Sequence, residues 1–272
     1  MTRIPGGRFL RHLAGHGRSR GIAAGAVGLI FLGWAAAART PDRDVLWRIV
    51  HDQCVPNQQQ NDTPAPCSLV VLKQGVDRGH AVLKDIRGAT QFLLIPTRRV
   101  SGIESPELLE PDAPNYFAAA WEARRFVEER AGRSLPRDGI SLAINSSLAR
   151  SQDELHIHVD CLRVDIRDSL REQAANITDR WAPLTVRLAG QRYLAMRVRG
   201  ASLDGQDPFQ LLAAGVPGAR QEMGRYTLVV VGMERPGGEP GFILLAARAD
   251  AATGHDGWGE ILQDHACALA QG

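Results

Sequence analysis

Two histidines separated by one residue, His156 and His158, stand out as residues that could perform chemistry. They lie in the segment 151–161, which alternates polar and apolar residues from Glu154 onward and therefore predicts a β-strand. Residues two apart on a strand project from one face about 7 Å apart, so both imidazoles could act on one phosphate or one metal ion. The spacing alone fits equally well two strand histidines without a catalytic role.

Covalent phosphoryl transfer is the first chemistry that such a pair could perform. A neutral histidine attacks phosphorus and gives a phosphoramidate, which water then hydrolyses. The attack needs an acceptor for the far ring nitrogen and donors for the phosphate oxygens, and paired arginines bind phosphate by forked hydrogen bonds. Suitable side chains occur at His158, Asn145, Ser147, Gln152, Arg98 and Arg99. By type alone, Asn145 and Ser147 fit turn residues, and Gln152 a solvated loop residue, better than they fit a site, whereas the two arginines fit a solvated charge pair equally well.

Two other functions fit the same strand. The pattern His156-x-His158-x-Asp160 resembles the first three ligands of the metallo-β-lactamase signature and would make the chain a metal-dependent hydrolase. Only two histidines follow in the chain, His255 and His265. The remaining alternative is a membrane-anchored module that binds a lipid, a nucleotide or a partner without catalysis.

Apolar runs predict the elements that would position the histidine strand. We expect further strands at 68–72, 80–84, 91–96 and 140–144, and helices at 42–54, 115–130 and 164–175. A second series weakly repeats the order strand, helix, strand, strand, at 193–198, 208–214, 226–232 and 241–247. The repeat suggests a degenerate duplication with halves at 68–175 and 185–272. A closing helix is expected over 259–269.

The N-terminal segment differs sharply from the rest of the chain. Residues 1–20 carry five arginines and no acid, and residues 21–38 are apolar and long enough to cross a bilayer as a helix. We expect a retained anchor with residues 42–272 exported, although a cleaved signal peptide fits too. Taking the five arginines from the 32 basic residues leaves 27 against 30 acidic ones. This balance argues against a nucleic-acid partner.

All four cysteines follow the apolar segment, at Cys54, Cys67, Cys161 and Cys267. An even number in an exported domain suggests disulfides, and four cysteines allow three pairings. Cys54 and Cys67 flank a polar, proline-containing segment that we expect to be a loop. A bridge there would stabilise the fold by roughly 3 kcal/mol in the chain-entropy model. Under that hypothesis Cys161 and Cys267 would join the central strand to the C-terminal segment.

Six segments together are similar to one family of proteins. They are CVPNQQQNDTPAPC (54–67), AVLKD (81–85), QFLLIPTRRVSGIESPEL (91–108), SLAINSSLARSQDELHIHVDC (141–161), ANITDRW (175–181) and GRYTLVVV (224–231). The chain resembles the histidine-triad superfamily, and most closely its membrane-bound branch, CDP-diacylglycerol pyrophosphatase. The likeness extends from about residue 44 to the end. It implies an α+β fold with a histidine-triad-like antiparallel sheet and one long helix.

The resemblance also implies an activity, hydrolysis of CDP-diacylglycerol to CMP and phosphatidate without a metal or other cofactor. It places the nucleophile at His156 and the third triad histidine at His158, with Glu154 where the first histidine would stand. Asn145 matches the asparagine on the phosphate side of the family's site, and Gln152 matches a polar residue on the loop that leads to the motif. The diacyl substrate implies work at a bilayer. We therefore expect a single-pass protein of the inner membrane, with its catalytic domain outside the cytoplasm and apolar residues after the anchor guiding the lipid.

Overall fold

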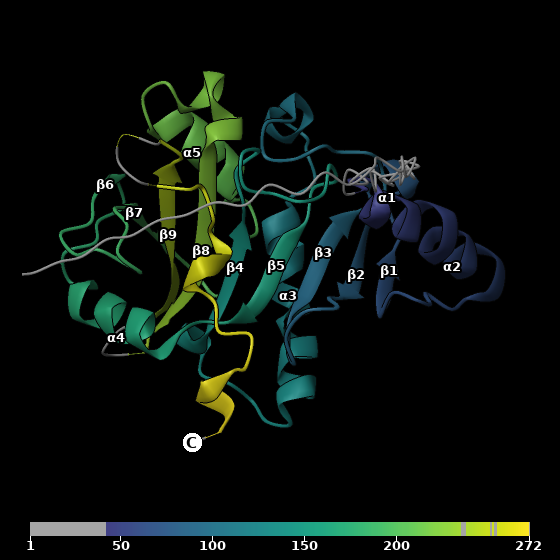
Figure 1. The fold of residues 1–272 in the computed structure, drawn as a ribbon, viewed down its shortest axis with the longest axis horizontal. Helices are drawn as coiled ribbons and strands as arrows, with labels where there is room; N and C mark the ends of the chain where they lie inside the picture. Colours follow the sequence, from purple (N-terminus) through teal and green to yellow (C-terminus); the bar gives the residue numbers. More distant parts are fainter. Residues whose placement is uncertain (1–41, 235–237, 251, 253–254, 272) are drawn as a thin grey trace, which may run out of the picture. The chain divides into compact units, whose positions relative to one another are not determined.

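The computed structural model describes residues 42–234, 238–250, 252 and 255–271 (Figure 1). Its strands are β1 (Leu69–Val71), β2 (His80–Lys84), β3 (Phe92–Pro96), β4 (Ile140–Ile144), β5 (Ile157–Cys161), β6 (Ala182–Pro183), β7 (Leu194–Arg199), β8 (Tyr226–Glu234) and β9 (Pro240–Arg248). Its α-helices are α1 (Val45–Ile49), α2 (Val55–Asn61), α3 (Tyr116–Ala131), α4 (Val164–Gln173) and α5 (Pro208–Gly215).

The expected basic segment 1–20 and membrane anchor 21–38 lie outside the described residues. Within the part of the chain that the structure describes, no helix is both long and apolar enough to cross a membrane. The anchor therefore stays a prediction.

One antiparallel sheet of nine strands organises the described chain, in the order β1-β2-β3-β5-β4-β8-β9-β7-β6. All neighbouring strands are antiparallel, and α3 is the longest helix, which confirms the predicted α+β class. Asn115, where the sequence predicted the helix to start, caps α3, because its side-chain oxygen accepts a hydrogen bond from the backbone N–H of Ala118 at 3.0 Å. Gly132 ends the helix in the left-handed conformation.

The two halves of the sheet have the same order of elements. β3, α3, β4 and β5 form one series and β7, α5, β8 and β9 the other, and the series meet where Ala143 of β4 pairs with Val229 of β8. In this mirrored order, β9 takes the place that β5 has in the first half, and β9 contains no histidine. A common origin of the halves stays a prediction.

The two faces of the sheet are covered differently. On one face, α3 and α5 pack on alternate residues of the central strands, such as Leu94, Leu142 and Val159. The opposite face carries two separate covers, α1–α2 over β1–β3 and α4 with the 260–262 segment over β4, β8 and β9. His158 pairs with Leu93 on one side and with Ala143 on the other, and so lies on this second face at the border between the covers.

Three expectations for local structure were wrong. The segment between Cys54 and Cys67 contains α2 instead of only a loop, because Pro56 falls in the first turn, where a helix tolerates proline. The closing helix is absent from 259–269, where two short 3₁₀ turns flank Gln263, which bridges Leu162 beside the sheet. The histidine strand begins at Ile157 instead of Glu154, so His156 lies at its entrance.

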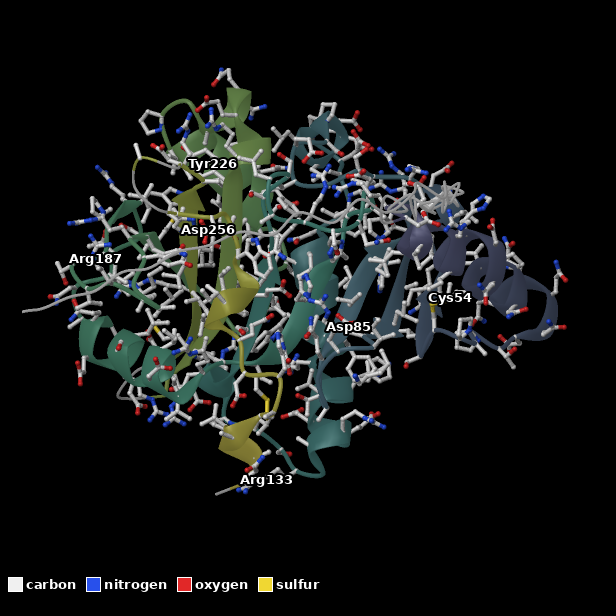
Figure 2. The ribbon with its side chains drawn as sticks, in the orientation of Figure 1. Cys54, Asp85, Arg133, Arg187, Tyr226 and Asp256 are labelled. Carbon is white, nitrogen blue, oxygen red and sulfur yellow. A yellow bond between two sulfur atoms is a disulfide. The ribbon has the colours of Figure 1, made fainter. Side chains whose placement is uncertain are left out.

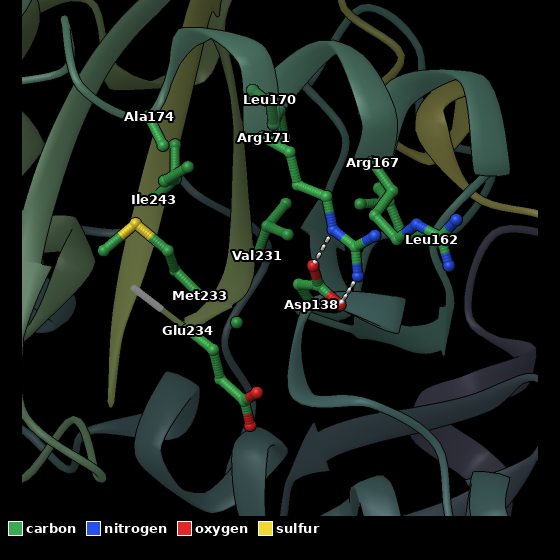
Figure 3. Close-up of a pocket in the computed structure, with 11 residues that line it drawn as sticks. Asp138, Leu162, Arg167, Leu170, Arg171, Ala174, Val231, Met233, Glu234 and Ile243 are labelled. Atoms are coloured by element: carbon green, nitrogen blue, oxygen red, sulfur yellow. Dashed lines mark hydrogen bonds and ion pairs between the residues drawn. The ribbon is translucent and has the colours of Figure 1, made fainter. Parts of the chain in front are cut away.

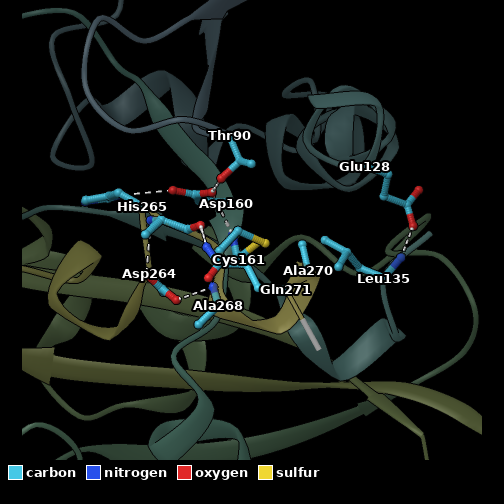
Figure 4. Close-up of a disulfide and its surroundings, with 12 residues drawn as sticks. Thr90, Glu128, Leu135, Asp160, Cys161, Asp264, His265, Ala268, Ala270 and Gln271 are labelled. Atoms are coloured by element: carbon cyan, nitrogen blue, oxygen red, sulfur yellow. Dashed lines mark hydrogen bonds and ion pairs between the residues drawn. A yellow bond between two sulfur atoms is a disulfide. The ribbon is translucent and has the colours of Figure 1, made fainter. Parts of the chain in front are cut away.

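Both disulfides have the pairing of our hypothesis. Cys54 and Cys67 are bonded at the helical layer over β1 and β2 (Figure 2), and Cys161 of β5 is bonded to Cys267 (Figure 4). The second bond joins residues 106 apart in the chain and fixes the C-terminal segment to the histidine strand.

Candidate active site

A cavity of about 410 Å³ opens at the border between the two covers, and both predicted histidines line it. Its wall on the α1 side is apolar, with Leu46, Ile49, Leu83 and Leu93. The other lining residues are Val45, Lys84, Asp85, Ile86, Arg87, Asn145, Ala149, Ser151, Gln152, His156, His158, Trp258 and Glu260. Asp85 marks the end of β2 in Figure 2. The cavity therefore combines an apolar wall with a polar wall that carries the imidazoles.

His156 is held in the tautomer that a nucleophile requires. Its Nδ1 lies 2.6 Å from the backbone carbonyl oxygen of Glu154, which can only accept, so Nδ1–H donates and Nε2 keeps a lone pair. The side chain is buried. Burial, with a smaller contribution from His158, lowers the pKa of His156 to about 4. The imidazole is therefore neutral at physiological pH.

His158 is the second imidazole of the site, with its ring centroid 5.0 Å from that of His156. Its Nδ1 lies 3.2 Å from Oε2 of Glu260 and 2.5 Å from the side-chain amide of Gln91. Burial lowers the pKa of His158, and the charge of Glu260 opposes this shift. An ionised carboxylate only accepts hydrogen bonds, so Glu260 favours hydrogen on Nδ1. The Gln91 amide fits this tautomer when its oxygen, and not its donor nitrogen, faces the ring. That tautomer leaves Nε2, which has no partner among the described residues, free to take up a proton.

Glu260 is a site residue that sequence reasoning missed. Burial favours a raised pKa, but His158 and the side chain of Asn145 outweigh it and lower the pKa of Glu260. Asn145 donates to Oε1 of Glu260 at 3.1 Å and accepts from the backbone N–H of Gly259 at 2.8 Å. The predicted Asn145 therefore lines the cavity as the residue that fixes Glu260 beside His158.

The C-terminal segment carries Glu260 into the site by close packing on the sheet. A Cβ at Gly259 would lie 2.4 Å from the hydroxyl oxygen of Thr227, so glycine is required for this approach. Gln263 donates to the backbone carbonyl of His158 at 3.1 Å, and the backbone N–H of Asp264 donates to that of Cys161 at 2.8 Å. The Cys161–Cys267 bond closes the arrangement (Figure 4).

Removing the Cys161–Cys267 disulfide should therefore lower activity as well as stability. In the Cys161→Ser/Cys267→Ser variant we expect a stability loss of about 3 to 5 kcal/mol and a kcat roughly tenfold lower, because Glu260 is no longer held on β5. Cys54→Ser/Cys67→Ser is the control, because that bond lies in the α1–α2 layer. Turnover measured well below both unfolding transitions should be unchanged in the control. Equal turnover of the two variants would contradict a role for the C-terminal segment.

Asp160 does not join the histidines. Its carboxylate is fully buried and accepts from Thr90 Oγ1 at 2.6 Å, from the backbone N–H of Cys161 at 2.9 Å and from His265 Nδ1 at 2.8 Å (Figure 4). The hydrogen bond from His265 raises the pKa of that histidine. In the described ranges, no group of three or more His, Cys, Asp or Glu side chains is arranged to hold a metal ion. The ligand set His156, His158 and Asp160 is thus not brought together.

Glu154, at the position of the first triad histidine, does not line the cavity. Its side chain is buried beside Val100, whose backbone N lies 3.5 Å from Oε1. Burial raises the pKa of Glu154 to about 8, so the side chain is a neutral acid at pH 7. The contribution of Glu154 to the site comes from its backbone carbonyl, which holds His156.

The other predicted residues divide between the cavity and its surroundings. Gln152 lines the cavity, but its amide donates to the carbonyls of Asp42 and Ser151 and accepts from the backbone N–H of Leu46, which joins α1 to this loop. Ser147, Arg98 and Arg99 are not among the lining residues. Ser147 donates a hydrogen bond to the backbone carbonyl of Gly224. Arg98 is paired with Glu107, and Arg99 with Asp44.

Lys84 and Arg87, which we did not predict, are the cations that line the cavity. Lys84 donates to the backbone carbonyls of Asp85 at 2.7 Å and of Gly88 at 3.0 Å. Lys84 lies in the AVLKD segment, one of the six segments that carry the family resemblance, and this segment could have identified it as a site residue. A pyrophosphate entering the cavity would meet these two positive charges.

A second cavity of about 410 Å³ lies between α4 and the strands β8 and β9 (Figure 3). Its floor is apolar, with Leu170, Val231 and Ile243, and Arg171 at its edge is paired with Asp138 at 2.5 Å. No histidine lines it. Of these two cavities, only the first therefore carries imidazoles suited to phosphoryl transfer.

A family model described as CDP-diacylglycerol pyrophosphatase matches residues 41–271. The match includes every element of the sheet and both cysteine pairs.

Proposed function

The chain belongs to the CDP-diacylglycerol pyrophosphatase family, and from this premise we propose that it hydrolyses its substrate through a covalent cytidylyl group on His156. Hydrolysis of the pyrophosphate bond of CDP-diacylglycerol is the activity of the family. The observation that carries the covalent route is the geometry of His156. Its Nδ1 is hydrogen-bonded to the backbone carbonyl of Glu154, and its neutral ring lines the cavity. The sheet also accords with the histidine-triad-like fold that the sequence predicts.

In the first step, Nε2 of His156 attacks the phosphorus nearer the cytidine. The P–N bond forms while the bond from this phosphorus to the bridging oxygen breaks, and phosphatidate leaves with that oxygen and its electron pair. Phosphatidate is a phosphate anion and a good leaving group, so charge stabilisation matters more than protonation of the leaving oxygen. Lys84 and Arg87 line the cavity and supply positive charge for the pyrophosphate oxygens.

In the second step, water attacks the same phosphorus and the P–N bond breaks, which releases CMP. The water must lose a proton, and we assign its uptake to Nε2 of His158, because this residue lines the cavity and Glu260 favours hydrogen on Nδ1. The imidazolium formed is stabilised by the carboxylate 3.2 Å away. The proton then passes to solvent, and His156 regains its lone pair.

Isotope labelling tests which phosphorus is attacked. Turnover in water enriched in oxygen-18 should place the label in CMP and leave phosphatidate unlabelled, because water attacks only the cytidylyl phosphorus. Mass spectrometry of the two products makes this measurement. Label in phosphatidate would contradict the proposed intermediate, and the absence of any release of CMP would contradict the activity.

The pH dependence should reflect the low pKa of His156. Protonation removes the nucleophilic lone pair, so activity is present above the pKa and is lost as the pH falls through it. Because the pKa is about 4, the acid limb of kcat/KM should lie near pH 4 instead of near the ordinary value of 6.5. The profile should be recorded with circular dichroism at each pH, so that unfolding is separated from titration. An acid limb at pH 6.5 in folded protein would contradict a neutral, buried nucleophile.

A further inference from the structure

Exposed large apolar side chains gather at the mouth of the active-site cavity. Among the residues that the structure describes, the exposed large apolar side chains are Val45 (39%), Ile86 (99%), Leu148 (67%), Val164 (38%) and Trp258 (44%). Three of them line the cavity, and Leu148 adjoins the lining residue Ala149. Single exposed apolar residues are ordinary on a protein surface, but three that line one cavity, with Leu148 next to a fourth lining position, form a patch that indicates a binding surface.

The four side chains, which we call the apolar rim, come from four separate segments. Val45 lies on α1, Ile86 follows β2, Leu148 lies between β4 and β5, and Trp258 lies in the C-terminal segment. Such segments would be expected to diverge unless something holds them together. Their convergence around the opening is therefore a property of the fold and not of one mobile loop.

Hydrogen bonds join the segments of the apolar rim to one another. The backbone N–H of Ser146 donates to the carbonyl of Gly257 at 2.9 Å, which places the Leu148 loop beside Trp258. The backbone N–H of Ala89 donates to the carbonyl of His265 at 2.9 Å and ties the Ile86 turn to the C-terminal segment. Gln152 accepts from the backbone N–H of Leu46, next to Val45. The rim is thus fixed while its side chains stay exposed.

The interior of the cavity continues the apolar rim. Val45 and Ile86 line the same cavity as Leu46, Ile49 and Leu83 of the apolar wall, and the cavity-lining cations Lys84 and Arg87 lie within two residues of Ile86 in the chain. A substrate with its pyrophosphate at His156 would direct its diacylglycerol part along this wall and out through the rim. This arrangement fits an occupant that has apolar chains beneath an anionic surface, because the cations of the protein would then lie at the level of the phosphates.

We propose that the apolar rim docks on the surface of a lipid bilayer and inserts its side chains among the lipid chains, so that CDP-diacylglycerol enters the site without leaving the membrane. This inference rests on the proposed function, because it takes the polar wall as the place of the pyrophosphate. It is separate from the predicted anchor 21–38, because it concerns only the surface around the cavity. Each buried apolar side chain contributes to membrane affinity in proportion to its area.

Rim variants of the full chain test the proposal with two substrates. One substrate is long-chain CDP-dioleoylglycerol in phosphatidylcholine vesicles, and the other is CDP-dibutanoylglycerol, dispersed as monomers in water. For Leu148→Ser, a change of a rim residue that does not itself line the cavity, we expect kcat/KM on vesicles to fall about tenfold and to stay within twofold on the monomeric substrate. Val164→Ser, which changes the exposed apolar residue of α4 away from the cavity, should stay within twofold on both.

A second measurement detects docking without catalysis. The fluorescence of Trp258 is the difference between the natural chain and the Trp258→Phe variant. When the full chain is bound to vesicles of brominated phosphatidylcholine, this fluorescence should be quenched, because bromine on the acyl chains quenches only tryptophan within the lipid. Unquenched Trp258 fluorescence, or rim variants that lose activity on both substrates alike, would overturn the docking proposal. Quenching in a chain that releases no CMP from either substrate would support docking and contradict the proposed function instead.

Discussion

Replacing His156 by alanine is expected to lower kcat by roughly a thousandfold or more, as the loss of a covalent nucleophile does. The reason is local, because this imidazole combines a fixed tautomer, a neutral ring and a position on the cavity wall. Initial rates of CMP release from CDP-diacylglycerol measure the effect. His51→Ala is a matched control, because His51 is exposed on the outer side of the helical layer, beside Asp52.

Chemical rescue separates loss of the nucleophile from a general disturbance of the site. The variant His156→Gly leaves room for an imidazole ring, and added imidazole should restore part of the turnover by attacking the same phosphorus. A cytidylyl imidazolide released into solution would identify the step. Full activity of the alanine variant would end the covalent proposal, whereas loss of activity without any rescue would assign His156 a structural part only.

Glu260→Gln is expected to lower kcat by roughly tenfold to a hundredfold, a part of what a general base contributes. The amide has the shape of the carboxylate but not the charge that favours hydrogen on Nδ1 of His158. Because Glu260 raises the pKa of His158 against the effect of burial, the substitution should lower that pKa further. NMR titration of His158 measures this directly, in a readout that a purely structural residue would not change.

The matched control for Glu260 is Glu172→Gln on α4, an exposed carboxylate away from the cavity. Its activity should stay within twofold of the natural chain. If Glu260→Gln keeps full activity and leaves the His158 titration unchanged, proton uptake does not pass through the His158–Glu260 pair.

The sequence predicted the sheet well because its strands are short apolar runs with clear ends. β2 and β4 have the predicted bounds, and α3 begins at Tyr116, one residue after the predicted start at Asn115. The α2 and 259–269 segments were misjudged for opposite reasons. Proline at 56 suggested a loop where a first helical turn tolerates it, and apolar residues near the end suggested a helix where the disulfide and sheet contacts hold an irregular segment.

The site was only partly accessible from sequence. The spacing of the two histidines predicted that they share a site, the family resemblance added Asn145, and all three line the cavity. Glu260 is more than a hundred residues away from His158, and only folding of the C-terminal segment onto β5 brings it there. Arg98 and Arg99 were predicted as site residues but do not line the cavity. Their side chains are paired with Glu107 and Asp44, and the sequence pattern does not reveal these partners. Residue type suggested a phosphate site there, while local ion pairs turn both side chains elsewhere.

Trapping the intermediate tests the central claim most directly. The chain should be mixed with CDP-diacylglycerol labelled in the cytidylyl phosphate, quenched within a turnover in alkali, where a phosphoramidate survives, and digested for mass spectrometry. We expect one cytidylyl group on His156, none on His158, and none in the His156→Ala variant. Labelled CMP formed at the normal rate with no modified peptide, or a modification on another residue, would contradict the account.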